Sequence, residues 1–400
     1  MKAATGRLLP AFYLSLLLLV TTVGTFAGGV WASAGIGGAI IMSLIVWFSD
    51  RRLPLPQTDL ALLTLAALPI IAVLNCISSA SDVSWAPWVR LVSIFLPLLF
   101  LSSPAIQTKA NHLHFGTVVL FAAMIGALAL GLELFLGGPL LHATKGVKAS
   151  LTEYNRGLSY LVLVAFPIMA DVRSDDRLAQ RPRRGVLVIL LLICALLIPA
   201  SLTESRAAKL ALVIGLAAMV AAQLWPIVTT YVLGVLPLLL LGWPFAAQKF
   251  FLRHYDWLAH FPDSWRDRME IWDYMSYRIL EHPWLGWGLG TSRLLDFQQP
   301  HGSQYVFRMT HAMHPHNVVT QLWVELGLPG LALGLGFAFV MSSKAYHLDA
   351  KIRPFALGSY AAALTLSLVA YDFWTDSLFA AFALTGFAFS VINRRLPRVT

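Results

Sequence analysis

The stretch GVLVILLLICALLIPASLTESRAAKLALVIGLAAMVAAQL, residues 185–224, contains two apolar runs that a short polar segment separates. Each run approaches the roughly 20 residues that a helix needs to cross a hydrocarbon core of about 30 Å. The apolar residues are continuous and do not alternate with polar ones, which favours helices over strands. The stretch therefore predicts two membrane-spanning helices whose polar connection lies at one membrane surface.

The rest of the chain repeats this pattern. Of its 400 residues, 58% are hydrophobic and only 12% are charged, with a mean hydropathy of +0.71, which predicts an all-α polytopic membrane protein and not a soluble domain. About 12 transmembrane helices are expected, over residues 8–27, 29–48, 58–77, 86–102, 113–135, 157–171, 185–201, 207–224, 226–244, 328–343, 355–371 and 376–393.

The spacing of these runs divides the chain into three parts. Residues 1–244 are expected to hold transmembrane helices 1–9, residues 245–327 one large loop with amphipathic helices, and residues 328–400 helices 10–12. A secretion signal is an alternative at the N-terminus, but apolar sequence continues to Phe48 and then meets Asp50-Arg51-Arg52, which predicts a returning hairpin. The separated residues Cys76 and Cys194 indicate neither a disulfide framework nor a metal site.

Basic residues set the orientation, because they accumulate in cytoplasmic loops. If both termini are cytoplasmic, the inner loops hold 16 of the 29 basic residues, namely Lys2, Arg7, Arg51, Arg52, Lys109, Arg173, Arg177, Arg181, Arg183, Arg184, Lys344, Lys351, Arg353, Arg394, Arg395 and Arg398. Arg90, Arg156 and Arg206 then fall at or inside spans on the outer side. A charge there costs roughly 2.5–3.5 kcal/mol on insertion scales, so it is either paired locally or functional.

The polar connection at residues 201–209 is suited to an anion. Ser201 and Glu204 have capping-box spacing, so a helix is expected to begin directly after them. Its free N–H groups and positive dipole end, together with Arg206 and Lys209, would hold a phosphate. Because the site lies at the membrane surface, a lipid head group is the expected ligand.

The large loop is the part of the chain that can cover such a site. Residues 264–281 predict an amphipathic helix that begins at Ser264 and ends before Pro283. Its apolar side holds Met269, Trp272 and Ile279, while Arg266, Glu270, Asp273 and Tyr277 share another side. Gly286-Trp287-Gly288-Leu289-Gly290 then predicts a tight turn. The many aromatic residues of the loop fit either an interfacial belt or a groove for sugars.

Three histidines gather in HAMHPHN, residues 311–317. His311, His314 and His316 lack the spacing of a zinc site, so no metal cofactor is expected. Two readings remain for His316, a residue that caps the following helix or a general base. A helix N-terminus and nearby arginines would keep it neutral and able to accept a proton.

His316-Asn317, nine residues, Gly327, two residues and Gly330 resemble the signature His-Asn-x9-Gly-x2-Gly of the bacterial O-antigen ligase family, within the O-antigen ligase/polymerase superfamily. The similarity extends to Thr203-Glu204-Ser205-Arg206, to Arg266, and to the segment from His282 to Gly288. It covers most of the chain. It implies a GT-C-like glycosyltransferase architecture with one large periplasmic loop.

The resemblance also implies the reaction. A metal-independent, inverting transfer would move a glycan from undecaprenyl diphosphate to a sugar hydroxyl of lipid A–core oligosaccharide, at the periplasmic face of the Gram-negative inner membrane. Membrane lipids are expected partners and nucleic acid is not. The implied base is His316, and Arg206 and Arg266 are the implied diphosphate ligands. Further residues expected at the site are Arg156, Arg90, Lys209, Asn317, His314, Glu204 and either Asp372 or Asp376.

Two alternatives share part of this pattern. An O-antigen polymerase or a protein O-oligosaccharyltransferase would use the same donor with another acceptor. A lipid-linked-sugar flippase would instead place polar residues along a path through the membrane midplane. The strong polar residues of this chain gather at the outer ends of spans, which favours a transferase.

Overall fold

The computed structural model describes residues 2–56, 86–111, 114–175, 180–242, 263–295 and 314–397, with isolated residues between 57 and 85 and between 243 and 262. Every regular element in these ranges is a helix. The longer ones are α1 (Lys2–Phe26), α2 (Gly29–Asp50), α4 (Ala86–Leu99), α6 (Gly116–Phe135), α8 (Asn155–Ser174), α10 (Pro182–Leu202), α11 (Arg206–Leu224), α12 (Pro226–Leu239), α14 (Asp263–Glu281), α15 (Val318–Tyr346), α16 (Arg353–Val369) and α17 (Asp376–Arg395). Short elements include η1 (Phe100–Ser102), α5 (Pro104–Ala110), α7 (Pro139–Lys145), η2 (Leu151–Tyr154), η3 (Leu240–Gly242) and η4 (Thr291–Arg293).

Most of these helices have the length of a membrane span. Within the described ranges, eight helices are long and apolar enough to cross a membrane, and the pair Leu91–Ser102 and Pro104–Ala110, bent by 59°, makes a ninth if it is one span. The predicted all-α polytopic membrane protein is therefore confirmed. The predicted number of about 12 spans stays a prediction, because the expected span at 58–77 lies outside the described residues.

Helix α8 forms the centre of the bundle. Nearly every side chain from Gly157 to Val172 is buried, and α8 contacts α1, α6, α10, α11, α16 and α17. Large apolar side chains on α6, α10 and α12 are instead exposed, among them Phe121, Leu187 and Val232. A surface of this kind is stable in lipid, where the surrounding chains are as apolar as the side chains.

Close backbone approach joins α11 to α16. A Cβ atom on Gly215 would lie 3.0 Å from the carbonyl oxygen of Gly358, and one on Gly358 would lie 2.7 Å from that of Gly215. Small residues at a crossing let membrane helices pack by van der Waals contact, which matters where the hydrophobic effect between helices is absent. This contact packs the middle of α11 closely against α16.

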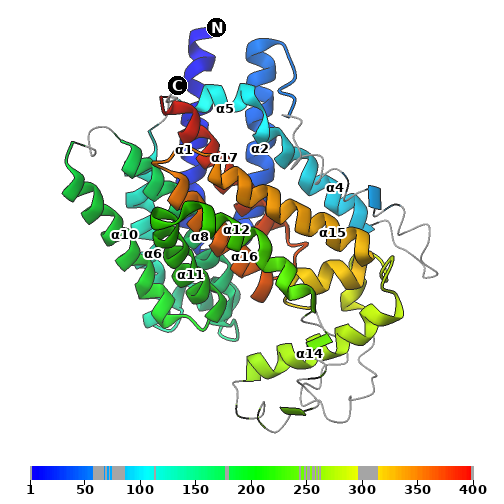
Figure 1. The fold of residues 1–400 in the computed structure, drawn as a ribbon. Coiled ribbons are helices and arrows are strands. Elements are labelled where there is room, and N and C mark those ends of the chain that lie inside the picture. The colour runs from blue at the N-terminus through cyan, green and yellow to red at the C-terminus, as the bar shows by residue number, and fades with distance from the viewer. Residues whose placement is uncertain are drawn as a thin grey trace.

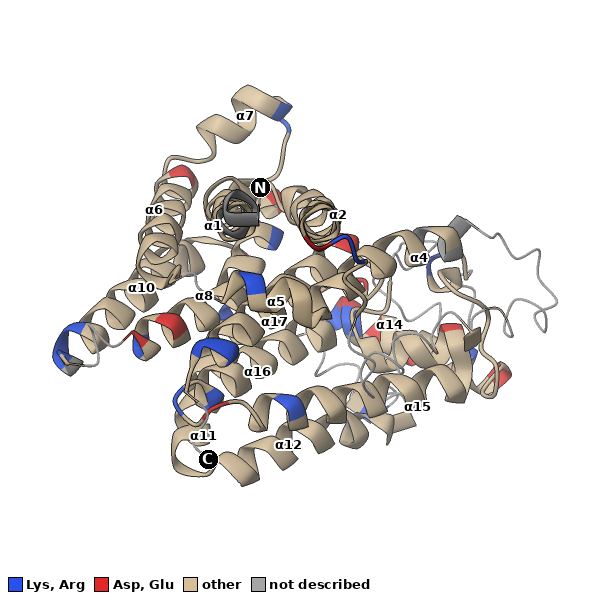
Figure 2. Cartoon of the chain, turned by 90° about the horizontal axis from the view of Figure 1, so that it is seen from above, with Lys and Arg blue, Asp and Glu red and all other residues tan. Residues whose placement is uncertain are grey.

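The bundle has two distinct ends. Both chain termini lie at one end, which we call the terminal end, and α14 lies beyond the opposite end, which we call the site end (Figure 1). At the terminal end Arg395 contacts Asp171, and Lys109 pairs with Asp50 at 2.6 Å. At the site end Thr203 donates a hydrogen bond to Asn155 Oδ1 at 2.7 Å. Viewed from the terminal end, most of the ribbon lacks charge, and charged residues gather at helix ends (Figure 2).

The large loop contributes α14, which matches the helix expected at residues 264–281. Its apolar side is buried as predicted, with Met269, Trp272 and Ile279 in one cluster. The side that holds the polar residues is also buried at Glu270 and Asp273. Helix α14 is therefore enclosed by protein on two sides.

Candidate functional site

The segment from His314 to Asn317 leads into α15, and three contacts fix its course. Asn317 is the N-cap of α15, and its Oδ1 accepts from the N–H groups of Val319 at 2.9 Å and Thr320 at 3.3 Å. The indole N–H of Trp272 on α14 donates to the Pro315 carbonyl at 2.8 Å. His316 has a φ of +54°, in the left-handed region that a non-glycine residue adopts only when its surroundings impose it.

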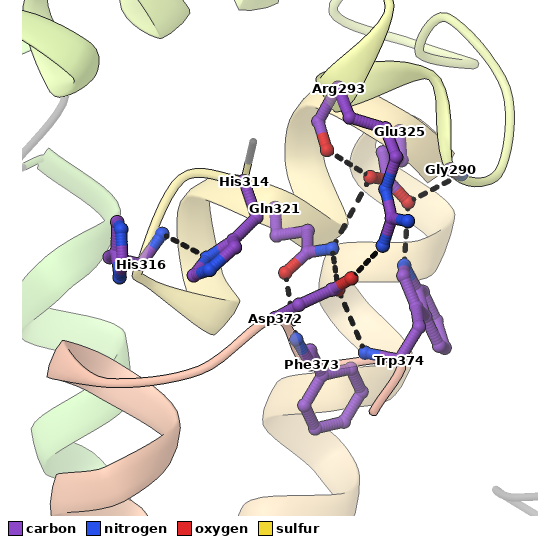
Figure 3. Close-up of polar contacts among 10 residues, drawn as sticks. Gly290, Arg293, His314, His316, Gln321, Glu325, Asp372, Phe373 and Trp374 are labelled. Atoms are coloured by element: carbon purple, nitrogen blue, oxygen red, sulfur yellow. Dashed lines mark hydrogen bonds and ion pairs between the residues drawn. The ribbon is translucent and has the colours of Figure 1, made fainter. Parts of the chain in front are cut away.

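The hydrogen bonds of His316 determine which ring nitrogen carries the proton. Its Nδ1 lies 2.9 Å from the carbonyl oxygen of Ala370, and a carbonyl oxygen only accepts, so Nδ1 donates. In the neutral ring the lone pair is then on Nε2. The backbone N–H of His316 donates to His314 Nδ1 at 3.3 Å, and the two ring centroids are 3.9 Å apart (Figure 3).

Both histidines are neutral at pH 7. Burial lowers the pKa of His316 to about 4; the hydrogen bond with Ala370 raises it, the charge of Arg268 lowers it, and the charge of Asp372 raises it. Burial also lowers the pKa of His314 to about 2, assisted by His316, Arg293, Arg156 and Arg268. The sequence suggested that arginines and a helix N-terminus keep His316 neutral, whereas burial is the largest cause.

Arginines from four separate segments surround this pair. Arg206 is the first residue of α11, Arg156 is the second residue of α8, Arg268 lies on α14 and Arg293 ends η4. Burial lowers the pKa of Arg268, Asp267 raises it, and the charge of Arg206 lowers it, which places Arg206 close to Arg268. The structure thus brings together Arg156 and Arg206 from the sequence prediction with two arginines that the sequence did not single out.

Helix periodicity explains why Arg268 faces the histidines once the contact of Trp272 is known. It lies one turn before Trp272, the residue that contacts Pro315, so both point from the same side of α14 toward the histidines. Arg266, the residue of the family pattern, lies two positions earlier, about 200° around a helix of 3.6 residues per turn. It is half-buried. The sequence alone did not distinguish the two, because it does not show which face of α14 meets the histidines.

The remaining predicted residues lie around this cluster or outside the described part of the chain. Lys209 is half-buried one turn after Arg206, and Glu204 is exposed in the connection before α11. The capping box predicted for Ser201 and Glu204 is wrong, because Ser205 is the N-cap and its Oγ accepts from Ala208 N–H at 3.2 Å. Arg90 lies in α4, but its side chain is outside the described part, as is His311.

A buried polar network adjoins the histidines. The Gln321 Nε2 amide donates to Asp372 Oδ1 at 2.7 Å and to Glu325 Oε1 at 3.3 Å, while its oxygen accepts from Phe373 N–H at 3.0 Å. Asp372 also forms an ion pair with Arg293 (Figure 3). Of the two acidic residues that the sequence left open, Asp372 belongs to this network and its charge raises the pKa of His316, while Asp376 is the first residue of α17.

The glycine of the signature allows two segments to meet. Gly327 has φ +65° and ψ −164°, a conformation essentially restricted to glycine, and a Cβ there would lie 2.2 Å from the Trp284 carbonyl oxygen. The N–H of Trp287 donates to Val324 O at 2.8 Å, and that of Gly288 to Glu325 O at 2.9 Å. The segment 284–288 therefore packs on the break in α15.

An apolar cavity of about 470 Å³ begins beside the site. Val318, Val319 and Phe373 line it near the histidines, and Lys344 and Leu348 line it toward the terminal end. Its other walls come from α4, α16 and α17. An apolar chain of a lipid could lie in it while a polar group occupies the site.

Comparison with known proteins bears on what this site does. Residues 186–335 match the family model of the O-antigen ligases. A relative from Rickettsia conorii, named as an inferred polysaccharide ligase, is 30% identical over 112 residues, and the match covers only 27% of each chain. A Rickettsia bellii protein with the same kind of name is 23% identical over 392 residues, or 90% of this chain and 92% of its own. These matches confirm the resemblance predicted from the sequence.

Proposed function

We propose that this chain, a member of the O-antigen ligase family, transfers a glycan from undecaprenyl diphosphate to a sugar hydroxyl of lipid A–core oligosaccharide. The observation that carries the proposal is the neutral His316, whose lone pair is on Nε2, close to Arg156, Arg206 and Arg268. The histidine supplies a base for the hydroxyl, and the arginines supply the charge that a diphosphate leaving group requires. The apolar cavity beside the site suits the polyprenyl chain of the donor.

The proposed reaction is a single displacement. His316 Nε2 takes the proton of the acceptor hydroxyl, and the hydroxyl oxygen forms a bond to the anomeric carbon. The bond from that carbon to the phosphate oxygen breaks, and its electron pair leaves with the diphosphate. Attack opposite the leaving group inverts the anomeric carbon, and no carboxylate nucleophile is needed. Arg206 and Arg268 neutralise the growing charge on the diphosphate, with Arg156 and Arg266 as further ligands.

The low pKa of His316 fits this sequence of events. Before the donor binds, burial and the charge of Arg268 favour the neutral ring of His316, so this base can accept a proton at neutral pH. A bound diphosphate adds negative charge beside the histidine and raises its pKa, because an anion stabilises the imidazolium. The base therefore becomes stronger when the donor is in place, and the proton that it takes is stabilised by the leaving group.

The proposed location follows from the two ends of the bundle. We infer about 12 spans in a GT-C-like architecture, with both termini cytoplasmic and the site end facing the periplasm of a Gram-negative inner membrane. The basic residues of the terminal end support this orientation, because basic residues favour the cytoplasmic side.

Transfer by purified protein tests the proposal. The full chain in lipid nanodiscs is mixed with polyprenyl-diphosphate glycan and, in separate reactions, with lipid A–core, a second lipid-linked glycan or an acceptor peptide, with EDTA present. Product on lipid A–core alone is expected. Product on the second glycan or the peptide would instead assign a polymerase or a protein transferase, and transport of the donor without any product would assign a flippase.

The His316→Ala variant tests the base. Loss of a general base lowers the rate by about 10²–10⁴-fold. The variant should still bind farnesyl diphosphate, because the arginines remain, and Leu187→Ala on the lipid-facing surface is the matched control. Turnover of His316→Ala near that of the wild type would remove His316 from the mechanism.

A further inference from the structure

Arg293 is a cation beside the histidines that belongs to neither the sequence signature nor the predicted site. It ends η4, and its side chain is 48% exposed while that of its partner Asp372 is 10% exposed. Its charge lowers the pKa of His314. Figure 3 shows the Arg293–Asp372 pair and His316 on opposite sides of His314. The guanidinium group is thus anchored at one side and accessible at the other.

Glu325 fixes the segment that carries Arg293. Its carboxylate is fully buried and accepts hydrogen bonds from four groups. These are the Gly290 N–H at 2.8 Å, the Trp374 Nε1–H at 2.6 Å, the Ser292 hydroxyl at 2.5 Å and the Gln321 amide at 3.3 Å. The two carboxylate oxygens accept all four hydrogen bonds, whereas a glutamine would bring an NH₂ group against donors. Two of the donors lie within three residues of Arg293.

Gln321 fixes the other partner of Arg293. One amide group donates to both Asp372 and Glu325, and its oxygen holds the backbone N–H of Phe373. The position of Arg293 is therefore determined twice, through η4 by Glu325 and through Asp372 by Gln321. Buried networks in which each group has its partners give a single, rigid arrangement.

We propose that Arg293 is a further phosphate-binding residue of this site, and that Glu325 and Gln321 are positioning residues that hold it there. A guanidinium group has five N–H donors in a planar fork, so it can keep its contact with Asp372 and present other N–H groups to a phosphate. The phosphate belongs either to the donor diphosphate or to a phosphorylated acceptor sugar. This inference rests on the proposed function of the site.

Binding and kinetics of the purified full chain distinguish the two sources. Arg293→Ala should weaken binding of farnesyl diphosphate about tenfold or more if the phosphate is the donor's, or raise the acceptor KM by that factor if it is the acceptor's. Arg293→Lys should recover part of the loss, because lysine keeps the charge but not the fork. Arg183→Ala, an exposed arginine at the terminal end, is the matched control.

A double-mutant cycle tests the positioning role. Whichever quantity Arg293→Ala changes, farnesyl diphosphate affinity or the acceptor KM, Glu325→Gln should change it in the same direction. The double variant should differ from the wild type no more than Arg293→Ala alone does, because Glu325 acts through Arg293. Ser292→Ala, which removes one of the four donors, should give a smaller change in the same direction, and Glu281→Gln in the same loop is the control. Losses that multiply in the double variant would make Glu325 merely structural and overturn its assignment.

Failure of this inference is separable from failure of the proposed function. A wild-type protein that neither transfers glycan nor binds farnesyl diphosphate would refute the proposed function. A wild-type protein that does both, with Arg293→Ala unchanged in donor binding and acceptor KM, would refute the role of Arg293 alone.

Discussion

The two ends of the bundle use the same residue type in opposite ways. At the terminal end, Arg395 forms an ion pair with Asp171, whose side chain is only 2% exposed, and Arg394 donates to Gln107 Oε1 at 2.8 Å. At the site end, Arg156, Arg206 and Arg268 gather near two neutral histidines, and their positive charges act on one another and on those rings. At the terminal end, arginines therefore join helices, whereas at the site end three arginines lie close to one another and to the histidines.

This difference has an energetic basis. A buried arginine–carboxylate pair is satisfied by its partner, and removal of either group leaves the other uncompensated. At the site end the charges of Arg206 and Arg268 oppose each other, and the negative charge of a diphosphate would offset that repulsion. The terminal end is accordingly built for stability and orientation, and the site end for binding.

Labelling of single cysteines tests the comparison at its largest scale. In a Cys76→Ser, Cys194→Ser background, Thr152→Cys marks the site end and Arg183→Cys the terminal end, and both positions are exposed. In intact cells with a permeable outer membrane, a membrane-impermeant thiol reagent should label the first completely and the second only after the inner membrane is opened. The reverse pattern would place the arginine cluster in the cytoplasm and remove the periplasmic reaction.

Arginine substitutions at the site end should change the donor KM, whereas a substitution at the terminal end should change the free energy of unfolding. Arg206→Ala and Arg268→Ala should each raise the donor KM by about 10–150-fold, because a charge-assisted contact contributes about 1.5–3 kcal/mol. Arg395→Ala should lower the free energy of unfolding by about 3–5 kcal/mol, since it removes the cationic partner of a buried carboxylate. Its donor KM should stay close to that of the wild type.

Donor titrations and thermal unfolding in detergent measure these two effects. The proposed difference between the two ends is wrong if Arg395→Ala raises the donor KM as much as Arg268→Ala does. It is also wrong if both site-end variants keep wild-type kinetics at limiting donor. Arg266→Ala, measured beside Arg268→Ala, shows which face of α14 meets the diphosphate.

The sequence predicted the helices well because membrane spans depend on local composition. The end of α14 at Glu281 followed from Pro283, and its start at Asp263 lies one residue before the expected Ser264. Arg268, Gln321 and Glu325 were missed for a different reason. Gln321 and Glu325 lie before the expected span at 328–343, in the part assigned to the large loop, and several of their partners come from η4 and from the segment 372–374. Contacts between segments far apart in the sequence are not visible in one sequence.

The N-cap of α11 was also not predictable from the sequence, although the two candidate serines are only four residues apart. Ser201 and Ser205 both precede residues suited to a helix, and the capping-box spacing favoured Ser201. In the structure Ser201 Oγ instead donates to the carbonyl oxygen of Ile198 at 2.7 Å, within the end of α10. Between the two serines, the Thr203 hydroxyl donates to Asn155 on α8 and accepts from the Ser205 N–H at 3.2 Å, which are contacts that the spacing of the sequence does not show.

The smallest expected effect is in the pH dependence, and it compares the two ends within one measurement. Because the pKa of His316 in the free protein is lowered to about 4, kcat/KM should be nearly constant from pH 6 to 8 and fall only as the pH drops toward that value. The charge of Arg268 lowers this pKa, so Arg268→Ala should raise it toward the ordinary value of about 6.5 and move the acid limb to higher pH. Arg395→Ala should leave the limb in place, because Arg395 lies at the terminal end. A limb near pH 6.5 in the wild type, or one that Arg268→Ala does not move, would show that the titrating base is not His316 in the environment described above.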